Sequence, residues 1–336
     1  MNIKENEPLS AYTTFKIGGP ARFFCAVSSE GELVEALKFA EGKRIPFFIL
    51  GGGSNLLVSD RGFDGLVVKM EMKGVIFSGD RVRAAAGEMW DELVAETVRR
   101  GLYGLENLSA IPGTVGATAV QNIGAYGAEV SKSIESVRIL EVKSGKFLML
   151  PAADCSFAYR DSLFKRQKNR HVVVNVTFRL DSKGKVNIAY KDLKEYFAAK
   201  SLGREPTLAQ VREAVINIRW GKLPDWKLWG TAGSFFKNPI VPVRKFIELK
   251  QKYPDLPGFP EGESLVKIAL GWILDKVCGL KGLCLGNACV FENQALVIVA
   301  KPGATASEVV DLTNEIRNKV KMRTGLEIEA EVEWVN

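Results

Sequence analysis

The stretch that decides the fold is SAIPGTVGATAVQNIGAYG, at residues 109–127. It is rich in glycine and alanine and contains no charged residue. So few bulky side chains cannot stabilise the stretch by packing, but they let its backbone approach another surface closely, and glycine also permits left-handed angles. Pro112 ahead of Gly113 indicates a turn. Taken alone, the stretch is as typical of a tightly packed crossing between two elements as of a cofactor cradle.

A second glycine-rich loop, GGGSN at residues 51–55, lies upstream. It follows an apolar stretch at residues 46–50 that is typical of a strand, and consecutive backbone N–H groups at the end of a strand can point at an anion. No Gly-Lys-Ser/Thr follows, which excludes a Walker loop, and residues 56–58 continue as a strand, so a Rossmann dinucleotide motif is weakly supported. Together the two glycine segments favour a site for a phosphate-bearing cofactor.

Composition limits the class of protein. The chain has 336 residues, 46% of them hydrophobic and 25% charged, which is ordinary for a globular protein and long enough for two or three domains. No apolar run approaches the roughly 18 residues of a membrane-spanning helix, and the polar N-terminus lacks a signal-peptide pattern, so we expect a cytoplasmic protein. The net charge of +7 permits an anionic partner, but the basic residues are scattered. We therefore expect a phosphorylated small molecule and no nucleic acid.

Few residues are available for metal or nucleophilic chemistry. The five cysteines are spread along the chain without a C-x-x-C pair, so we expect buried free thiols and neither a disulfide framework nor a metal site. The one histidine, His171, lies in an apolar run typical of a strand. Acid–base chemistry must therefore use serine, tyrosine, lysine, arginine or carboxylate side chains.

The hydrophobic pattern predicts an α+β chain. Helices are expected after the capping motifs at Ser29 and Thr305, and further helical faces lie at residues 90–98, 191–219 and 265–273. The alternating sequence LEIEAEVEW at residues 326–334 predicts a final strand with four glutamates on one face. Further strands are expected at residues 21–27, 46–50, 56–58, 66–69, 81–86, 136–142, 146–150, 172–180 and 294–301.

A series of motifs resembles one family of flavoenzymes. The motifs are TTF and IGG at residues 13–19, LGGGSNLLV at 50–58, AIPGTVGAT at 110–118, QNIGAYGA at 121–128, FAYRDSLFK at 157–165, KLPD at 222–225, AGSFFKNPI at 232–240 and AEV at 330–332. Each is weak alone, but all of them in this order are specific. Over nearly its whole length the chain resembles the UDP-N-acetylenolpyruvoylglucosamine reductase family, which acts in bacterial cell-wall precursor synthesis.

The resemblance implies a fold and a division into domains. It implies an FAD-binding fold of the FAD-linked oxidase type, made of two α+β subdomains, and a C-terminal α+β substrate-binding domain. We expect the subdomains at residues 1–68 and 69–218 and the substrate-binding domain at residues 219–325. The final strand, at residues 326–336, can return to the first subdomain.

The resemblance also implies where FAD would bind. The loop at residues 51–55 would bind the pyrophosphate through backbone amides, and the 109–127 stretch would wrap the flavin and its ribityl chain. NADPH would be the reductant. The predicted cofactor-binding residues are Gly51, Gly52, Gly53, Ser54, Asn55, Ile111, Pro112, Gly113, Thr114, Gly116, Ala117, Gly124 and Tyr126.

The family reduces an enol-ether double bond, and three residues match its catalytic positions. Ser234 matches the proton donor, while Arg160 and Glu331 match the pair that holds the substrate carboxylate region and stabilises the enol intermediate. An arginine can grip a carboxylate bidentately, whereas a serine is a poor acid whose role depends on placement. A glutamate beside an enolate helps only if it is protonated or orients another donor. Without the resemblance, the favoured interpretations would be structural. Arg160 would cap a turn, Ser234 would bond backbone groups in a Gly-Ser turn, and Glu331 would be a solvated surface residue.

Four further positions match contacts to a UDP-sugar substrate: Tyr190, Arg219, Lys222 and Asn238. Tyr190 opens a longer stretch that resembles the class of the family in which a tyrosine loop closes over the nucleotide. A lysine can serve as a point charge for a diphosphate. We expect a monomer without a metal. The alternatives are another FAD-linked oxidase acting on an alcohol or hydroxy acid, which would not need AGSFFKNP, and a basic nucleic-acid-binding protein, which would need a clustered positive face.

Overall fold

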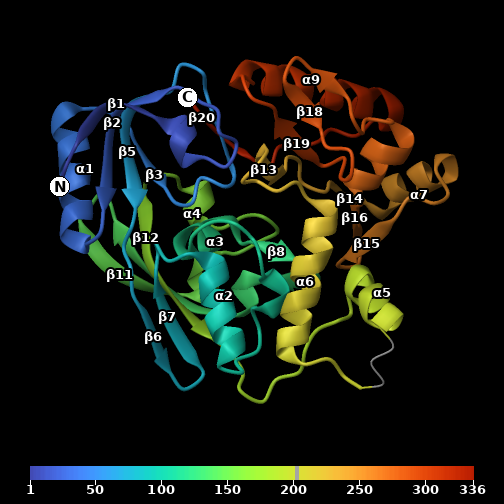
Figure 1. Cartoon of the computed structure of the whole chain (residues 1–336), viewed down its shortest axis with the longest axis horizontal. Helices are drawn as coiled ribbons and strands as arrows, with labels where there is room; N and C mark the ends of the chain where they lie inside the picture. Colours follow the sequence, from blue (N-terminus) through green and yellow to red (C-terminus); the bar gives the residue numbers. More distant parts are fainter. Residues whose placement is uncertain (201–203) are drawn as a thin grey trace. The chain divides into compact units, whose positions relative to one another are not determined.

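The computed structural model describes residues 1–200 and 204–336, which form two compact units (Figure 1). Both units mix helices and strands, which confirms the predicted α+β class. The three-part division predicted from the sequence stays a prediction. The first unit consists of Met1–Glu7, Ala21–Gly53 and Asp64–Gly221, and the second of Pro8–Pro20, Ser54–Phe63 and Lys222–Asn336.

Two main sheets organise the first unit. One has the strand order β1-β2-β5-β3, in which β3 and β5 are parallel, and the other is the antiparallel sheet β11-β10-β12-β7-β6. A short antiparallel pair, β8 with β9, lies within the glycine-rich stretch. The strands are β1 (Lys4–Pro8), β2 (Pro20–Val27), β3 (Phe47–Leu50), β5 (Phe63–Met70), β6 (Val75–Ser78), β7 (Arg81–Ala85), β8 (Gly124–Ala125), β9 (Ala128–Glu129), β10 (Ile134–Glu141), β11 (Lys146–Pro151) and β12 (His171–Arg179).

Helix α1 (Glu30–Lys43) covers one face of the first sheet (Figure 1). It begins at the predicted motif, because the Ser29 side chain accepts a hydrogen bond from the N–H of Glu32 at 3.2 Å. Its apolar face, with Leu33 fully buried, packs against the strands. The other α-helices of this unit are α2 (Trp90–Arg99), α3 (Val115–Gln121), α4 (Leu163–Arg166), α5 (Lys191–Lys200) and α6 (Leu208–Lys222).

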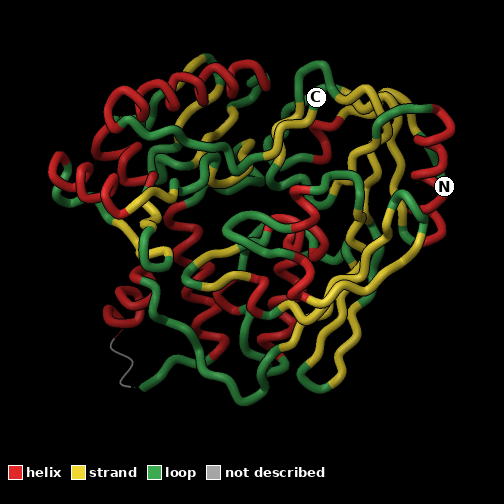
Figure 2. The backbone as a smooth tube through the Cα atoms, turned by 180° about the vertical axis from the view of Figure 1, so that it is seen from behind, coloured by secondary structure: helices red, strands yellow, loops and turns green. Residues whose placement is uncertain are grey.

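The second unit is built on the antiparallel sheet β13-β19-β18-β17. Helix α9 (Ala306–Thr324) begins at the predicted capping box of Thr305 and Glu308 and lies along this sheet (Figures 1 and 2). This unit also contains the sheet β14-β16-β15, the parallel pair β20-β4, helices α7 (Val243–Lys252) and α8 (Leu270–Trp272), and two further short helical segments, Leu9–Tyr12 and Ile273–Val277. The strands are β4 (Leu56–Val58), β13 (Gly230–Ser234), β14 (Ile240–Pro242), β15 (Gly258–Glu261), β16 (Leu265–Ile268), β17 (Cys284–Leu285), β18 (Ala288–Val290), β19 (Val297–Ala300) and β20 (Glu333–Val335).

Two differences from the sequence prediction concern the elements at residues 265–273 and 326–334. The helical stretch predicted at residues 191–219 is two helices, α5 and α6, and its residues 201–203 lie outside the described chain. The helical face expected at residues 265–273 is wrong over its first half, because Leu265–Ile268 is a strand paired with β14 and β15. Its buried residues, Val266 and Ile268, alternate with less buried ones, so a period of two replaces the helical period. The final strand is also shorter than predicted. Burial alternates from Leu326 onward, but only Glu333–Val335 is a strand, and Trp334 is 41% exposed.

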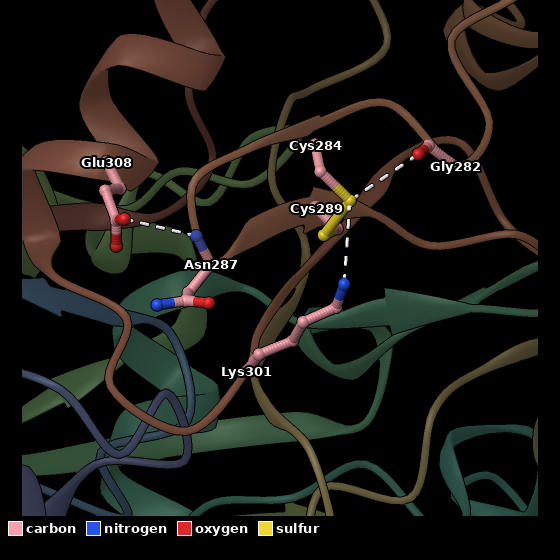
Figure 3. The surroundings of a disulfide bond; sticks show 6 residues. All are labelled: Gly282, Cys284, Asn287, Cys289, Lys301 and Glu308. Carbon is pink, nitrogen blue, oxygen red and sulfur yellow. Dashed lines mark hydrogen bonds between the residues drawn. A yellow bond between two sulfur atoms is a disulfide. The ribbon is translucent and has the colours of Figure 1, made fainter.

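The cysteines divide into a disulfide and three free thiols. Cys284 and Cys289 are direct partners across the β17–β18 hairpin and form a disulfide, so the expectation of free thiols is wrong for this pair (Figure 3). The hairpin register, which their spacing does not reveal, brings the two sulfurs together. Cys25 and Cys155 are buried free thiols as expected, and Cys278 is half-buried. Burial raises the pKa of Cys25 to about 11 and that of Cys155 to about 12.

Two properties of the described residues bear on the class of protein. In residues 1–200 and 204–336, no helix has the length and apolar content needed to cross a membrane. The same residues contain no group of three or more histidine, cysteine, aspartate or glutamate side chains placed to hold a metal ion. The described part of the chain therefore presents no preformed metal cage.

Candidate functional site

The two glycine-rich segments meet within the first unit. Strand β3 ends at Leu50 and leads directly into Gly51 and Gly52. A Cβ atom on Gly51 would lie 2.8 Å from the Thr114 hydroxyl, and one on Gly52 would lie 2.6 Å from the Cα of Gly113. Because backbone leaves no room for a methyl group, glycine is required at position 52. Gly51 and Gly52 of the first segment thus lie directly against Gly113 and Thr114 of the second.

Thr114 tests whether these two segments fit a bound cofactor. Its side chain is buried, and its Oγ1 has no hydrogen-bond partner within residues 1–200 and 204–336. Leaving a buried hydroxyl unpaired costs about 1–3 kcal/mol, so a ligand that supplies the missing partner is favoured there. A phosphate-rich, flat cofactor such as FAD offers both the polar partner and a surface against which bare backbone can lie. The residues present therefore fit FAD.

Lys69 also contacts the first glycine segment, and no sequence motif predicts this contact. Its Nζ donates a hydrogen bond to the carbonyl oxygen of Gly51. Burial lowers the pKa of the Lys69 ammonium, while the nearby Glu71 carboxylate partly opposes this. Lys69 therefore fixes the carbonyl of the first glycine from the neighbouring strand β5.

Three charged side chains surround Ala110, at the start of the second segment, and the sequence analysis selected only one of them, Arg219. The Ala110 N–H donates to Asp91 Oδ1 at 2.6 Å, and the Ala110 carbonyl accepts from Arg219 Nε at 3.2 Å. Arg212 donates to both oxygens of Asp91, at 2.6 and 2.9 Å. The one available signal is that Arg212 and Arg219 lie seven residues, or about two turns, apart on α6. Sequence reasoning thus missed Asp91 and Arg212.

The electrostatics of this cluster favour its charged form. Burial on its own would raise the pKa of Asp91, but the hydrogen bonds from Arg212 and Ala110 and the two arginine charges outweigh it, so the pKa is lowered. Burial lowers the pKa of Arg219, and Tyr126 and Asp91 oppose that change. An anionic Asp91 therefore lies between two guanidinium groups at neutral pH.

Tyr126, Tyr190 and Arg219 come together as predicted ligand-contact residues of the first unit. The two tyrosine rings pack edge to face with centroids 5.5 Å apart. Burial raises the pKa of Tyr126 to about 12, although the Arg219 charge and a hydrogen bond from Arg219 act in the opposite direction. In this cluster Tyr126, a predicted cofactor-binding residue, contacts Tyr190 and Arg219, two predicted substrate-binding residues.

Arg160 lies beside another predicted cofactor residue, Gly124. Its Nη2 donates to the Gly124 carbonyl, and a Cβ atom on Gly124 would lie 2.8 Å from Nη1. The Arg160 backbone has a φ of 54°, and its carbonyl accepts a hydrogen bond from Lys165 at 3.0 Å. Arg160 therefore lies in a turn that Lys165 helps to fix, with its guanidinium against the Gly124 carbonyl.

In the second unit, three predicted residues from distant segments gather around one backbone contact. Ser234 ends β13 after Gly233, whose φ of 73° suits glycine. The N–H of Glu331 donates to the carbonyl of Phe235 at 2.7 Å, and the Glu331 carbonyl accepts from Asn55 at 3.0 Å. Glu331 and Glu333 are both half-buried, whereas Glu327 and Glu329 are exposed, so burial alone does not single out Glu331 among the four glutamates. The strand that carries Ser234 therefore lies next to the segment that carries Glu331.

Two predicted substrate residues have simpler surroundings. The Asn238 side-chain oxygen accepts a hydrogen bond from the Leu270 N–H at 3.0 Å, so part of its role is to fix the start of α8. Lys222 is exposed at the end of α6. An exposed lysine suits a contact with a charged ligand, whereas Asn238 retains a structural role that the sequence did not reveal.

Comparison with known proteins identifies the family. Residues 21–150 match the FAD binding domain, and residues 225–335 match the C-terminal domain of UDP-N-acetylenolpyruvoylglucosamine reductase. The UDP-N-acetylenolpyruvoylglucosamine reductase of Neisseria gonorrhoeae is 45% identical over 339 residues, which cover 99% of this chain and 97% of the relative. The chain belongs to the UDP-N-acetylenolpyruvoylglucosamine reductase family.

Other members of the reductase family agree over the same length. The protein of Paraburkholderia phymatum is 42% identical over 331 residues, covering 96% of this chain and 95% of the relative. The crystal structure of the Thermus caldophilus reductase superposes with a TM-score of 0.71 at 25% identity, covering 100% of this chain and 98% of that one. The chain is therefore a flavin-dependent oxidoreductase, and the predicted fold class and FAD cofactor are confirmed.

Within this reductase, the predicted site residues divide between the two units. Arg160, the glycines at residues 51–53 and the cluster around Tyr126 belong to the first unit, and Ser234 and Glu331 belong to the second. The roles assigned to them by resemblance stay predictions.

Proposed function

We propose that the chain catalyses the NADPH-dependent, FAD-mediated reduction of the enolpyruvyl double bond of UDP-N-acetylglucosamine enolpyruvate to UDP-N-acetylmuramate, for peptidoglycan synthesis. The proposal rests on 45% identity to a reductase of that name over 99% of the chain. The observation that carries it to named residues is the 2.7 Å hydrogen bond that joins the Glu331 segment to the strand of Ser234. We retain the sequence predictions of a cytoplasmic monomer.

The cofactor would be held mainly by backbone. Residues 51–55 would bind the pyrophosphate through N–H groups, and residues 111–117 with Gly124 and Tyr126 would contact the flavin and ribityl chain. The unpaired Thr114 hydroxyl would find its hydrogen-bond partner on the cofactor. When bound, FAD accepts a hydride from NADPH and supplies a hydride to the methylene carbon of the substrate.

The catalytic side chains would bind and neutralise the reacting carboxylate region. The Arg160 guanidinium would grip the substrate carboxylate and favour the negative charge that develops beside it. The Ser234 hydroxyl would give its proton to the carbon that bears the carboxylate, which completes addition across the double bond. Glu331 would stabilise the enol form by holding or orienting a proton. Tyr190, Arg219, Lys222 and Asn238 would bind the UDP-sugar.

The activity can be tested in two half-reactions. The purified protein is expected to show a flavin absorption spectrum that NADPH bleaches without oxygen. The enolpyruvyl sugar nucleotide should restore the spectrum, and UDP-N-acetylglucosamine should not. Anaerobic restoration by a ketone or keto acid, and not by the enolpyruvyl sugar nucleotide, would instead favour an FAD-linked enzyme acting on an alcohol or hydroxy acid.

The role of Ser234 gives the first site-specific prediction. Ser234→Ala should leave bleaching by NADPH nearly unchanged but slow turnover of the enolpyruvyl substrate by about 10²–10⁴-fold, since a positioned proton donor contributes that much. Stopped-flow absorbance measures both steps. Ser264→Ala, at an exposed position, is the matched control and should change neither. Equal loss in both half-reactions would contradict a proton-donor role.

A further inference from the structure

Ala110 adopts a conformation that alanine disfavours, directly before the predicted flavin-contact residues. Its φ is 57°, in the left-handed region, which costs a residue with a Cβ atom about 1–2 kcal/mol. Such a conformation persists only where the surroundings fix it. Here both peptide groups of Ala110 are bound by charged side chains, with the N–H on Asp91 and the carbonyl on Arg219.

The start of helix α2 holds the same segment at three points. Asp91 binds the N–H of Ala110 at 2.6 Å. The neighbouring residue, Trp90, donates from its indole to the Leu108 carbonyl at 2.9 Å and from its backbone N–H to the Gly113 carbonyl at 3.0 Å. Trp90 is fully buried, so α2 is a fixed platform. The geometry of residues 108–113 is thus set by two consecutive residues from another part of the chain.

Arg212 completes the arrangement because it fixes Asp91 in turn. Both of its terminal nitrogens bind the two carboxylate oxygens, and its side chain is only 16% exposed. A planar bidentate pair restricts the carboxylate to one orientation. Arg212 and Arg219 both project from α6, so this one helix acts on both sides of the Ala110 peptide.

We propose that Asp91, oriented by Arg212, is a positioning residue for FAD: it holds Ala110 in its left-handed conformation and so sets the course of residues 111–117 against the cofactor. The inference rests on the proposed FAD site. It also joins that site to the predicted substrate side, because Arg219, which holds the other end of the Ala110 peptide, contacts Tyr126.

A merely structural ion pair between α2 and α6 is the competing explanation. Breaking such an ion pair would lower the stability of the apoprotein without a selective loss of FAD affinity. Replacing Ala110 by glycine would then not restore any FAD affinity. The two explanations therefore differ in FAD binding and in the response to Ala110→Gly.

FAD affinity of the full-length apoprotein is the primary measurement, taken from the change in flavin fluorescence on binding. Asp91→Ala should weaken FAD binding about 10- to 100-fold, the range for losing a hydrogen bond to a charged group. Arg212→Met should weaken it less, about 3- to 10-fold, because Asp91 remains but is no longer oriented. Glu96→Gln, which breaks exposed ion pairs on the same helix, is the control and should leave the affinity unchanged.

The decisive variant combines Asp91→Ala with Ala110→Gly. Glycine adopts the left-handed conformation without cost, so the double variant should recover at least fivefold of the lost affinity, whereas a structural ion pair predicts no recovery. If Asp91→Ala does not fold, Asp91→Asn with and without Ala110→Gly answers the same question. Unchanged FAD affinity with a lower melting temperature, or no recovery with glycine, would overturn the proposal. A wild-type protein that never binds FAD would instead refute the proposed site itself.

Discussion

The glycine loop at residues 51–53 and the segment at residues 109–117 are both rich in small residues, but their backbones are fixed by different means. Steric fit is the main constraint on the first, since Gly51 and Gly52 face Thr114 and Gly113 with no space for a Cβ atom, and Lys69 adds one hydrogen bond to the Gly51 carbonyl. Side chains from elsewhere fix the second, through hydrogen bonds to peptide groups at Leu108, Ala110 and Gly113. Small residues in the sequence thus indicate where two backbone segments approach each other. The side chains that fix the course of such a segment cannot be recognised from the sequence around it.

The steric half of this comparison predicts the largest effect. Gly52→Ala would place a methyl group 2.6 Å from the Gly113 Cα, with backbone that cannot move aside. We expect a loss of about 2–4 kcal/mol in the free energy of unfolding and more than a hundredfold weaker FAD binding. Chemical denaturation and flavin fluorescence measure the two quantities.

Gly42→Ala is the matched control for this substitution. Gly42 lies in α1, and a Cβ atom there would meet nothing within 4 Å. Alanine should therefore leave FAD binding unchanged and stabilise the fold by about 0.5–1 kcal/mol, as expected for a helical glycine. Similar losses of stability and FAD affinity in Gly42→Ala and Gly52→Ala would show that steric fit is not what fixes the loop at residues 51–53.

Thr114→Val tests a polar side chain of the second segment. The substitution removes a buried hydroxyl that has no partner in the described chain, so the apoprotein should be as stable or more stable, by up to about 1 kcal/mol. FAD binding should weaken about tenfold, because the bound cofactor would lose its hydrogen bond. Thermal unfolding with and without FAD tests both. Equal affinity in the variant would mean that the hydroxyl does not face the cofactor.

Acid provides the mildest test, because the second segment is held by a carboxylate that acid protonates, whereas the first is held by steric fit and by the Lys69 ammonium, which acid leaves charged. The pKa of Asp91 is lowered in the folded protein, so its contribution to stability is present above its ordinary value and is lost as the pH falls through the lowered value. The gap in melting temperature between wild type and Asp91→Ala should be constant above about pH 5 and narrow below about pH 4. The gap caused by Gly52→Ala should not narrow, and a similar narrowing would contradict the distinction.

Much of the fold follows from the sequence because local patterns determine it. The capping motifs at Ser29 and Thr305 begin helices, and most predicted strands are present. The misassigned stretch at residues 265–268 shows the limit of such reasoning, since four apolar-patterned residues fit a strand or a helix and pairing with β14 and β15 decides between them.

The candidate site was predictable wherever residue type alone carries the chemistry. The glycines and the sequence around Ser234 have a characteristic pattern, whereas the choice of Glu331 stays a prediction, because Glu333 is half-buried as well. Asp91 and Arg212 could not be found, because they are ordinary charged residues on two helices and only the tertiary fold places them 2.6 Å apart. The pairing of Cys284 with Cys289 escaped for the same reason, since it depends on hairpin register.

The β17–β18 hairpin has a practical consequence for anyone who prepares this enzyme. Closed by its disulfide, the denatured chain offers three thiols to an alkylating reagent, whereas full reduction offers five. Cys284 is an exposed residue and Cys289 is buried, so we expect a reductant to approach the disulfide from the Cys284 side. The choice of purification buffer therefore selects between two covalent forms of the protein, which intact mass distinguishes by a pair of hydrogen atoms.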